Sequence, residues 1–153
     1  AASDVYKRQV IARAEVRRAR RDMNQALLNR FNIAFDLNFH GSQLKDYPHI
    51  AEYGRRIKAL RERYAAELWN AEFVERQGAQ VNGPDLSYSV FAGRNGKRAV
   101  VVVNMGTERA SKAEVTLPGA SAMAYASPED SAQKTFGGSV EIAPQSAVVI
   151  FEK

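Results

Sequence analysis

A run of five residues without a polar side chain, at positions 99–103, constrains the fold of this chain more than any other feature. Its sequence is AVVVV, and valine is β-branched, so the run favours extended backbone. A continuous apolar run of this length is typical of a strand in the buried centre of a sheet. The run follows Asn95 and Gly96, which are typical of a β-hairpin turn. Residues 97–104 are therefore predicted to form a buried central strand.

Five further β-rich runs surround this strand, and short turns separate them. The turn signals include Pro118-Gly119 and Gly137-Gly138. The runs cover residues 86–92, 113–117, 122–126, 138–142 and 146–152. Six short strands within about 70 residues predict a small antiparallel β-sandwich over residues 84–153. A domain of this size could fold alone, although with little stability.

The first half of the chain is predicted to be mainly helical. Apolar residues recur at three- and four-residue steps over residues 10–29 and, more regularly, over residues 47–73. Asp46 is a suitable N-cap for the second helix, and Pro48 suits its first turn. The composition changes near Gln77, so a helical segment, residues 10–77, precedes the sandwich. The predicted fold class is therefore α+β.

Residues 31–42 allow two interpretations. Ile33, Phe35, Leu37 and Phe39 alternate with less apolar residues, and this period of two is typical of a β-strand. The rival interpretation is a continuation of the preceding helix. Gly41 would end either element.

The composition excludes several kinds of site. The chain contains no cysteine and two histidines, so it can form no disulfide or thiolate metal site, and neither a metal nor a cofactor is expected. No apolar run approaches the roughly 20 residues that span a bilayer, so no membrane partner is expected.

The net charge of +5 lies entirely within the first 30 residues, which carry eight Lys and Arg against three Asp and Glu. Five of these arginines fall within residues 13–21, as a nucleic-acid contact would require. The other face of this predicted helix is apolar, and no aromatic residue lies among the arginines for base stacking. A solvated or salt-bridged helix face is the favoured interpretation, and no nucleic-acid partner is expected.

The first nine residues, AASDVYKRQ, open with alanine rather than methionine. They resemble a translated adapter tail that recurs at the ends of environmental sequence reads. We expect this tail to be foreign to the protein, whose own sequence would then be truncated just before Val10.

The order of the parts resembles the C-terminal end of glycoside hydrolases that carry a (β/α)₈ barrel followed by a β-sandwich. The resemblance covers residues 25–153 and lies in four segments: RERYAAELW at 61–69, AVVVVN at 99–104, AEVTLP at 113–118 and IAPQSAVVIF at 142–151. The α-amylase-like and α-galactosidase-like groups share this plan, as do poorly characterised relatives, which this sequence resembles more closely.

This resemblance implies that residues 10–77 are the tail of a barrel. Residues 33–40 would form a late barrel strand and residues 47–73 the last barrel helix, while the N-terminal barrel portion would be missing. The parent would then be a carbohydrate-active hydrolase with a carbohydrate substrate. The sandwich would be a structural accessory domain, and this piece would be inactive alone.

Four residues are candidates for the site. Glycoside hydrolysis usually needs two carboxylates, and Asp36 is the acid whose place on the presumed barrel strand suits this chemistry. Asp36, Asn38 and His40 would share one face of that strand near its C-terminal end, where barrel active sites lie. Asp36 and His40 are therefore catalytic candidates, and Asn38 is a candidate for substrate binding. The alternative is that these groups satisfy hydrogen bonds near a loop or line a solvated helix face.

Trp69 is the other candidate for substrate binding, because an aromatic ring at such a joint can stack on a sugar. The alternative is that Trp69, with Tyr64 and Phe73, forms a hydrophobic seam between helix and sandwich.

A second reading of the whole chain is a non-catalytic carbohydrate-binding or protein-interaction module with a helical arm. Exposed aromatic residues in a row on the sandwich would favour a binding module. Aromatic residues hidden against the helices would favour a structural sandwich.

Overall fold

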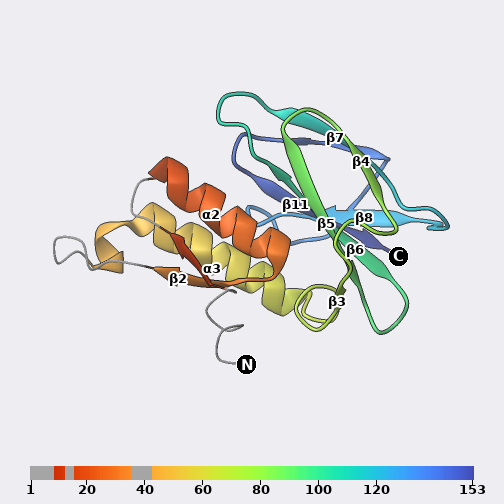
Figure 1. Cartoon of the computed structure of the whole chain (residues 1–153), viewed down its shortest axis with the longest axis horizontal. Helices are drawn as coiled ribbons and strands as arrows, with labels where there is room; N and C mark the ends of the chain where they lie inside the picture. The colour runs from red at the N-terminus through yellow and green to blue at the C-terminus, as the bar shows by residue number, and fades with distance from the viewer. Residues whose placement is uncertain (1–8, 13–15, 36–42) are drawn as a thin grey trace.

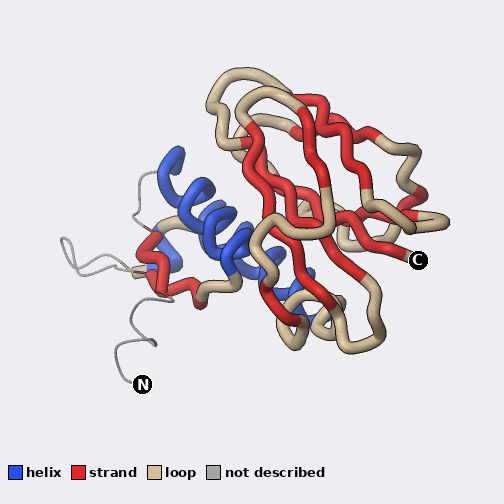
Figure 2. Tube along the Cα trace, turned by 45° about the vertical axis from the view of Figure 1, so that its right-hand side comes forward, coloured by secondary structure: helices blue, strands red, loops and turns tan. Residues whose placement is uncertain are grey.

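The computed structural model describes residues 9–12, 16–35 and 43–153. Two helices cover one face of a six-stranded sheet, and a three-stranded sheet covers the other face (Figures 1 and 2). Helices therefore precede antiparallel sheets, as the α+β class predicted from the sequence requires.

The N-terminal part alternates strand and helix. Its elements are β1 (Gln9–Ala12), α2 (Val16–Asn29), β2 (Asn32–Phe35), the 3₁₀ helix η2 (Leu44–Asp46) and α3 (Pro48–Arg63). Strands β1 and β2 pair in parallel, with Val10 opposite Ile33. Parallel neighbours need a crossover connection, and α2 provides it.

The helix predicted over residues 10–29 is confirmed for Val16–Asn29, whereas Gln9–Ala12 is a strand. The β-branched pair Val10-Ile11 fits the apolar pattern of a helix and that of a strand. Its pairing with β2 stabilises the extended backbone. Of the two interpretations of residues 31–42, the strand is confirmed for Asn32–Phe35, and residues 36–42 lie outside the described residues.

Helix α3 differs from its prediction at both ends. Its N-cap is Tyr47 rather than Asp46, because the Asp46 carboxylate instead accepts a hydrogen bond from the Gln43 N–H at 2.7 Å and closes η2. The helix ends at Arg63 and not at residue 73. Residues 72 and 73, predicted as the end of this helix, instead form strand β3 (Glu72–Phe73), which pairs with residues 91–92.

The large sheet has the strand order β3-β5-β6-β11-β8-β9, and the small sheet has the order β10-β7-β4. Their bounds are β4 (Gln80–Asn82), β5 (Leu86–Ala92), β6 (Arg98–Asn104), β7 (Ser111–Thr116), β8 (Met123–Ala126), β9 (Lys134–Thr135), β10 (Ser139–Ile142) and β11 (Ala147–Glu152). The six predicted strands are all present, within two residues at each end. Strands β3, β4 and β9, which are two or three residues long, were not predicted.

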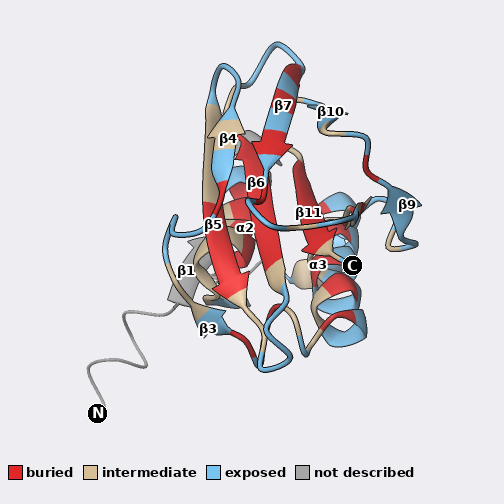
Figure 3. Cartoon of the chain, turned by 90° about the vertical axis from the view of Figure 1, so that its right-hand side faces the viewer, coloured by how far each residue is buried: buried red, intermediate tan, exposed pale blue. Residues whose placement is uncertain are grey.

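Two hydrophobic cores lie on opposite faces of the large sheet. On β6, Ala99, Val101 and Val103 pack with the helices, whereas Val100 and Val102 pack with the small sheet. Strand β11 alternates in the same way. The continuous apolar run at 99–103 therefore exists because both faces of its strand are covered, which Figure 3 shows as the buried strands between the two outer layers.

Candidate functional site

The three candidates on the presumed barrel strand, Asp36, Asn38 and His40, lie outside the described residues. Their roles therefore stay predictions. They directly follow β2, which ends at Phe35. The fourth candidate, Trp69, is described.

Trp69 lies in the turn region after α3, with 40% of its surface exposed. The Arg61 guanidinium lies 5.0 Å from the centre of its ring. Tyr64 and Phe73 behave differently, because Tyr64 belongs to the core between helices and sheet and Phe73 packs against that core. The hydrophobic seam therefore contains Tyr64 and Phe73, and Trp69 lies outside it.

A groove of about 570 Å³ runs along one flank of α3, from Leu44 to Trp69. We call it the α3 groove. Its lining comes from β2, η2, α3 and the turn that follows: Asn32, Ile33, Leu44, Ala51, Gly54, Arg55, Lys58, Arg61, Glu62, Ala65 and Trp69. The α3 residues among them recur at three- and four-residue steps, so they share a face. The sheet-packing residues Tyr53, Ile57 and Leu60 occupy another face.

The cations of the α3 groove have partners within the protein. Arg61 donates a hydrogen bond to the Ala26 carbonyl in the last turn of α2, where the helix dipole is negative. Burial lowers the pKa of Arg61 to about 10, so its guanidinium keeps its charge at neutral pH. Lys58 pairs with Glu62, and Arg55 pairs with Glu52 at 3.6 Å. The lining of the groove thus combines apolar side chains with charged side chains that have partners within the protein.

This arrangement does not supply the two carboxylates that glycoside hydrolysis usually needs. Among the residues that line the α3 groove, Glu62 is the one carboxylate, and it is already engaged by Lys58. Within residues 9–12, 16–35 and 43–153, no group of three His, Cys, Asp or Glu side chains could hold a metal ion.

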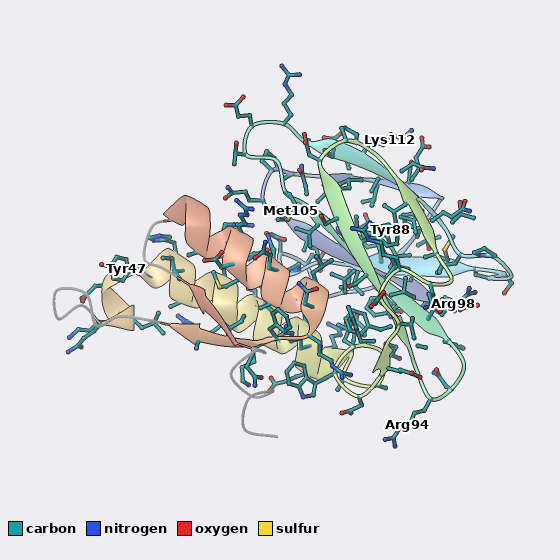
Figure 4. All side chains as sticks on the ribbon, in the orientation of Figure 1. Tyr47, Tyr88, Arg94, Arg98, Met105 and Lys112 are labelled. Atoms are coloured by element: carbon teal, nitrogen blue, oxygen red, sulfur yellow. The ribbon has the colours of Figure 1, made fainter. Side chains whose placement is uncertain are left out.

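The aromatic residues of the sandwich do not form an exposed row. Phe91 is buried, and Tyr88 and Tyr125 are half-buried. The guanidinium of Arg76 covers Tyr88 at 5.3 Å from the ring centre, and Tyr125 meets Phe136 edge to face. Figure 4 shows Tyr88 among the side chains of the sandwich, whereas Arg94 extends away from the tip of the β5–β6 turn. In the described part of the chain, Trp69 is the one exposed large hydrophobic residue.

None of the helices in the described residues is long and apolar enough to cross a bilayer.

Comparison with known proteins finds no matching family model and no matching curated protein. Among solved structures, the chain is similar to a GH27 β-L-arabinopyranosidase from Geobacillus stearothermophilus, with a TM-score of 0.53 and 16% identity. The match covers 86% of this chain and 29% of that enzyme. A structure of the same enzyme in complex with arabinose matches with a TM-score of 0.55 and 16% identity, over 89% of this chain and 30% of the other.

The chain therefore shares the fold of one segment of a glycoside hydrolase, and it spans less than a third of the length of the enzymes it matches. At 16% identity, this likeness concerns the fold alone.

Proposed function

We propose that this chain is the C-terminal part of a carbohydrate-active hydrolase whose β-sandwich is a structural accessory domain to a catalytic (β/α)₈ barrel. The observation that carries the proposal is the succession β1–α2–β2–α3, a parallel strand–helix repeat, followed directly by an antiparallel double sheet. In this proposal residues 10–77 are the end of the barrel and residues 84–153 are the sandwich.

The parallel pair β1–β2 supports a larger parent. Parallel sheets are rarely found as isolated two-stranded units, because they rely on cover from both faces and on several strands. Among the described residues, β1 and β2 pair only with each other, and β2 borders the apolar α3 groove through Asn32 and Ile33. Further strands and helices of the parent barrel would complete this sheet and cover the groove.

The chemistry is assigned to the C-terminal end of β2. Barrel enzymes place their active sites at this end of their strands, and Asp36, Asn38 and His40 follow it in sequence. In the proposal Asp36 and His40 take part in catalysis, and Asn38 contacts the carbohydrate substrate. Trp69 stays the second candidate for a substrate contact, because 40% of its surface is exposed in the described chain and an exposed ring can stack on a sugar.

The structural role of the sandwich rests on where its side chains point. One face of the large sheet packs on α2 and α3, and the other packs on the small sheet. No row of exposed aromatic residues is found on the described strands. These features favour a supporting domain over a carbohydrate-binding or protein-interaction module.

The test begins by recovering the coding DNA upstream of this sequence and expressing the extended chain beside the 153-residue chain. Both are assayed on a panel of aryl glycosides. We expect turnover by the extended chain and none by the shorter one, because the part of the barrel that would carry the second carboxylate is missing from the shorter chain. Turnover by the 153-residue chain alone would contradict the proposal, as would an extension without alternating strands and helices.

Variants of the extended chain then test the assigned residue. Asp36→Asn is expected to lower kcat by a factor of about 10² or more, as loss of a general acid or base does. Asp130→Asn is the matched control, because Asp130 lies on the surface of the sandwich, where it pairs with Lys134. This control is expected to leave kcat unchanged.

A further inference from the structure

We propose that a polar latch between α2, α3 and two loops of the sandwich fixes the position of the helices on the sheet. The latch consists of Arg20 and Asn24 on α2, Tyr53 on α3, Glu129 in the β8–β9 loop and the Gln145 carbonyl in the β10–β11 turn. This inference goes beyond the proposed function and does not depend on it, because it concerns contacts within this chain alone.

The centre of the latch is a buried hydrogen-bond chain. The Tyr53 hydroxyl donates to the Asn24 side-chain oxygen at 2.5 Å, and the Asn24 amide donates to the Gln145 carbonyl at 2.8 Å. Asn24 is 0% exposed and Tyr53 is 3% exposed, so neither group can exchange its partner for water. Burial raises the pKa of Tyr53 well above its ordinary value, so the hydroxyl keeps the proton that it donates.

Arg20 joins this chain to the two loops. Its guanidinium lies 3.9 Å from the centre of the Tyr53 ring and donates to Glu129 at 2.6 Å. It also reaches the Gln145 carbonyl and the Ser146 hydroxyl, each at 3.3 Å. A planar guanidinium suits this combination, because it can stack with its face while it donates with its edge. One side chain of α2 thus contacts α3 and both loops.

The turn at Gln145 presents its carbonyl through an unusual backbone conformation. Gln145 has a φ of 51°, in the left-handed region that side-chain-bearing residues rarely adopt. Its N–H donates to the Gly106 carbonyl at 3.1 Å, which holds the turn against the β6–β7 connection. The carbonyl is then available to Asn24 and Arg20 together.

The β8–β9 loop also holds the second helix. The Tyr64 hydroxyl, one residue after α3, donates to the Ser131 carbonyl at 2.6 Å, and Arg63 donates to the Ser131 hydroxyl at 3.2 Å. The loop is therefore fastened to the α2 side through Glu129 and to the α3 side through Ser131.

The polar latch selects one position of the helices on the sheet, which the apolar contacts of this interface cannot do. Hydrophobic burial is not directional, so helices could settle on the sheet at several similar positions. A buried donor or acceptor that loses its partner costs far more than an apolar contact that shifts, so the latch favours one position. The hydrophobic core supplies most of the attraction, and the latch selects the geometry.

Hydrogen exchange followed by mass spectrometry on the full 153-residue chain tests the latch. Tyr53→Phe keeps the ring but leaves the Asn24 oxygen without its donor. We expect exchange of the α2 amides and of residues 143–147 to become about tenfold faster or more, since an unsatisfied buried acceptor is costly. Exchange in β5 and β6 is expected to stay unchanged.

Glu129→Gln is the second variant, because Glu129 is 39% exposed at its side chain and its replacement does not threaten the fold. Exchange of α2 is expected to rise about two- to fivefold at low salt, and the difference should shrink at about 1 M salt, where exposed charges are screened. Glu114→Gln is the matched control. Glu114 pairs with Lys112 at 3.4 Å on the small sheet, away from the helices, and its loss should change nothing at α2.

Two results would overturn the latch. One is a uniform acceleration over all elements in Tyr53→Phe together with no change in Glu129→Gln, which would make Tyr53 an ordinary core residue. The other is unchanged exchange at α2 in both variants. Neither result involves a carbohydrate, so neither bears on the proposed function.

Discussion

Replacement of Phe151 by alanine is expected to lower the free energy of unfolding by about 3–5 kcal/mol, the usual cost of truncating a fully buried phenylalanine. Phe151 is 1% exposed, and it lies on the face of β11 that packs against the helices. Its ring centre lies 4.5 Å from that of Tyr64, just after α3. The truncation would leave a cavity between the two parts of the chain, and urea denaturation with linear extrapolation measures the loss.

The matched control for Phe151→Ala is Glu141→Ala. Glu141 is exposed on β10 of the small sheet, so its replacement should change stability by less than about 0.5 kcal/mol. A loss below about 1 kcal/mol for Phe151→Ala would mean that the helices and the sheet do not share a core.

The second large effect is expected at the ion pair between Arg98 and Glu152. The Arg98 Nε–H donates to Glu152 Oε2 at 2.8 Å, and its Nη2 donates to Oε1 at 3.1 Å, so the pair is bidentate. Arg98 also donates to the carbonyls of Gly78 and Pro118. The side chains are 21% and 15% exposed, which places the pair between a surface salt bridge and a buried one.

Arg98→Met is expected to cost about 2–4 kcal/mol, less than the 3–5 kcal/mol for breaking a fully buried pair. The variant would remove the side-chain donors to the Glu152 carboxylate and to two carbonyls, whereas the backbone N–H of residue 98 would still donate to Glu152 Oε2. Thermal or urea unfolding at neutral pH measures the loss. Lys112→Met is the control, because the exposed Lys112–Glu114 pair should contribute no more than about 0.5 kcal/mol.

The same pair makes the stability depend on pH. The hydrogen bond from Arg98 lowers the pKa of Glu152 below its ordinary value. The folded protein therefore gains stability from the ionised carboxylate above the unfolded pKa of about 4.3, and it loses that gain as the pH falls through the lowered folded pKa. The unsubstituted chain should lose more stability on acidification below about pH 4.3 than the Arg98→Met variant does. Parallel pH profiles would contradict this assignment.

The sheet was largely predictable from the sequence, because its signals are local. Apolar runs between turns located the six longer strands, and the valine run at 99–103 indicated the centre of the sheet. The short strands β3, β4 and β9 carry too few residues for any pattern. Phe73 shows the limit most clearly, because the predicted helix extends to it, yet it pairs with Phe91 on the neighbouring strand.

The contacts of individual polar and aromatic side chains were less predictable than the strands, because the partners of these side chains are distant in sequence. Arg20 belongs to a run of arginines for which a solvated or salt-bridged helix face was predicted, and Arg20 does form an ion pair with Glu129. That partner lies 109 residues away, and no local pattern connects the two. Both Trp69 and Tyr64 were expected in the hydrophobic seam. Tyr64 lies in the core between helices and sheet, whereas Trp69 does not. Only the packing of α3 on the sheet decides which aromatic residue is covered.

The helices and the large sheet share a hydrophobic core, so we expect the two parts of the chain to unfold together. Urea unfolding monitored by two signals tests it most directly. Trp69 is the single tryptophan of the chain and lies on the helical side, so its fluorescence reports on that part, and far-UV circular dichroism near the β-sheet minimum reports on the strands. We predict one transition with the same midpoint in both signals. A fluorescence transition at lower urea, with the sheet signal still intact, would contradict the shared core and make the sandwich an independent module.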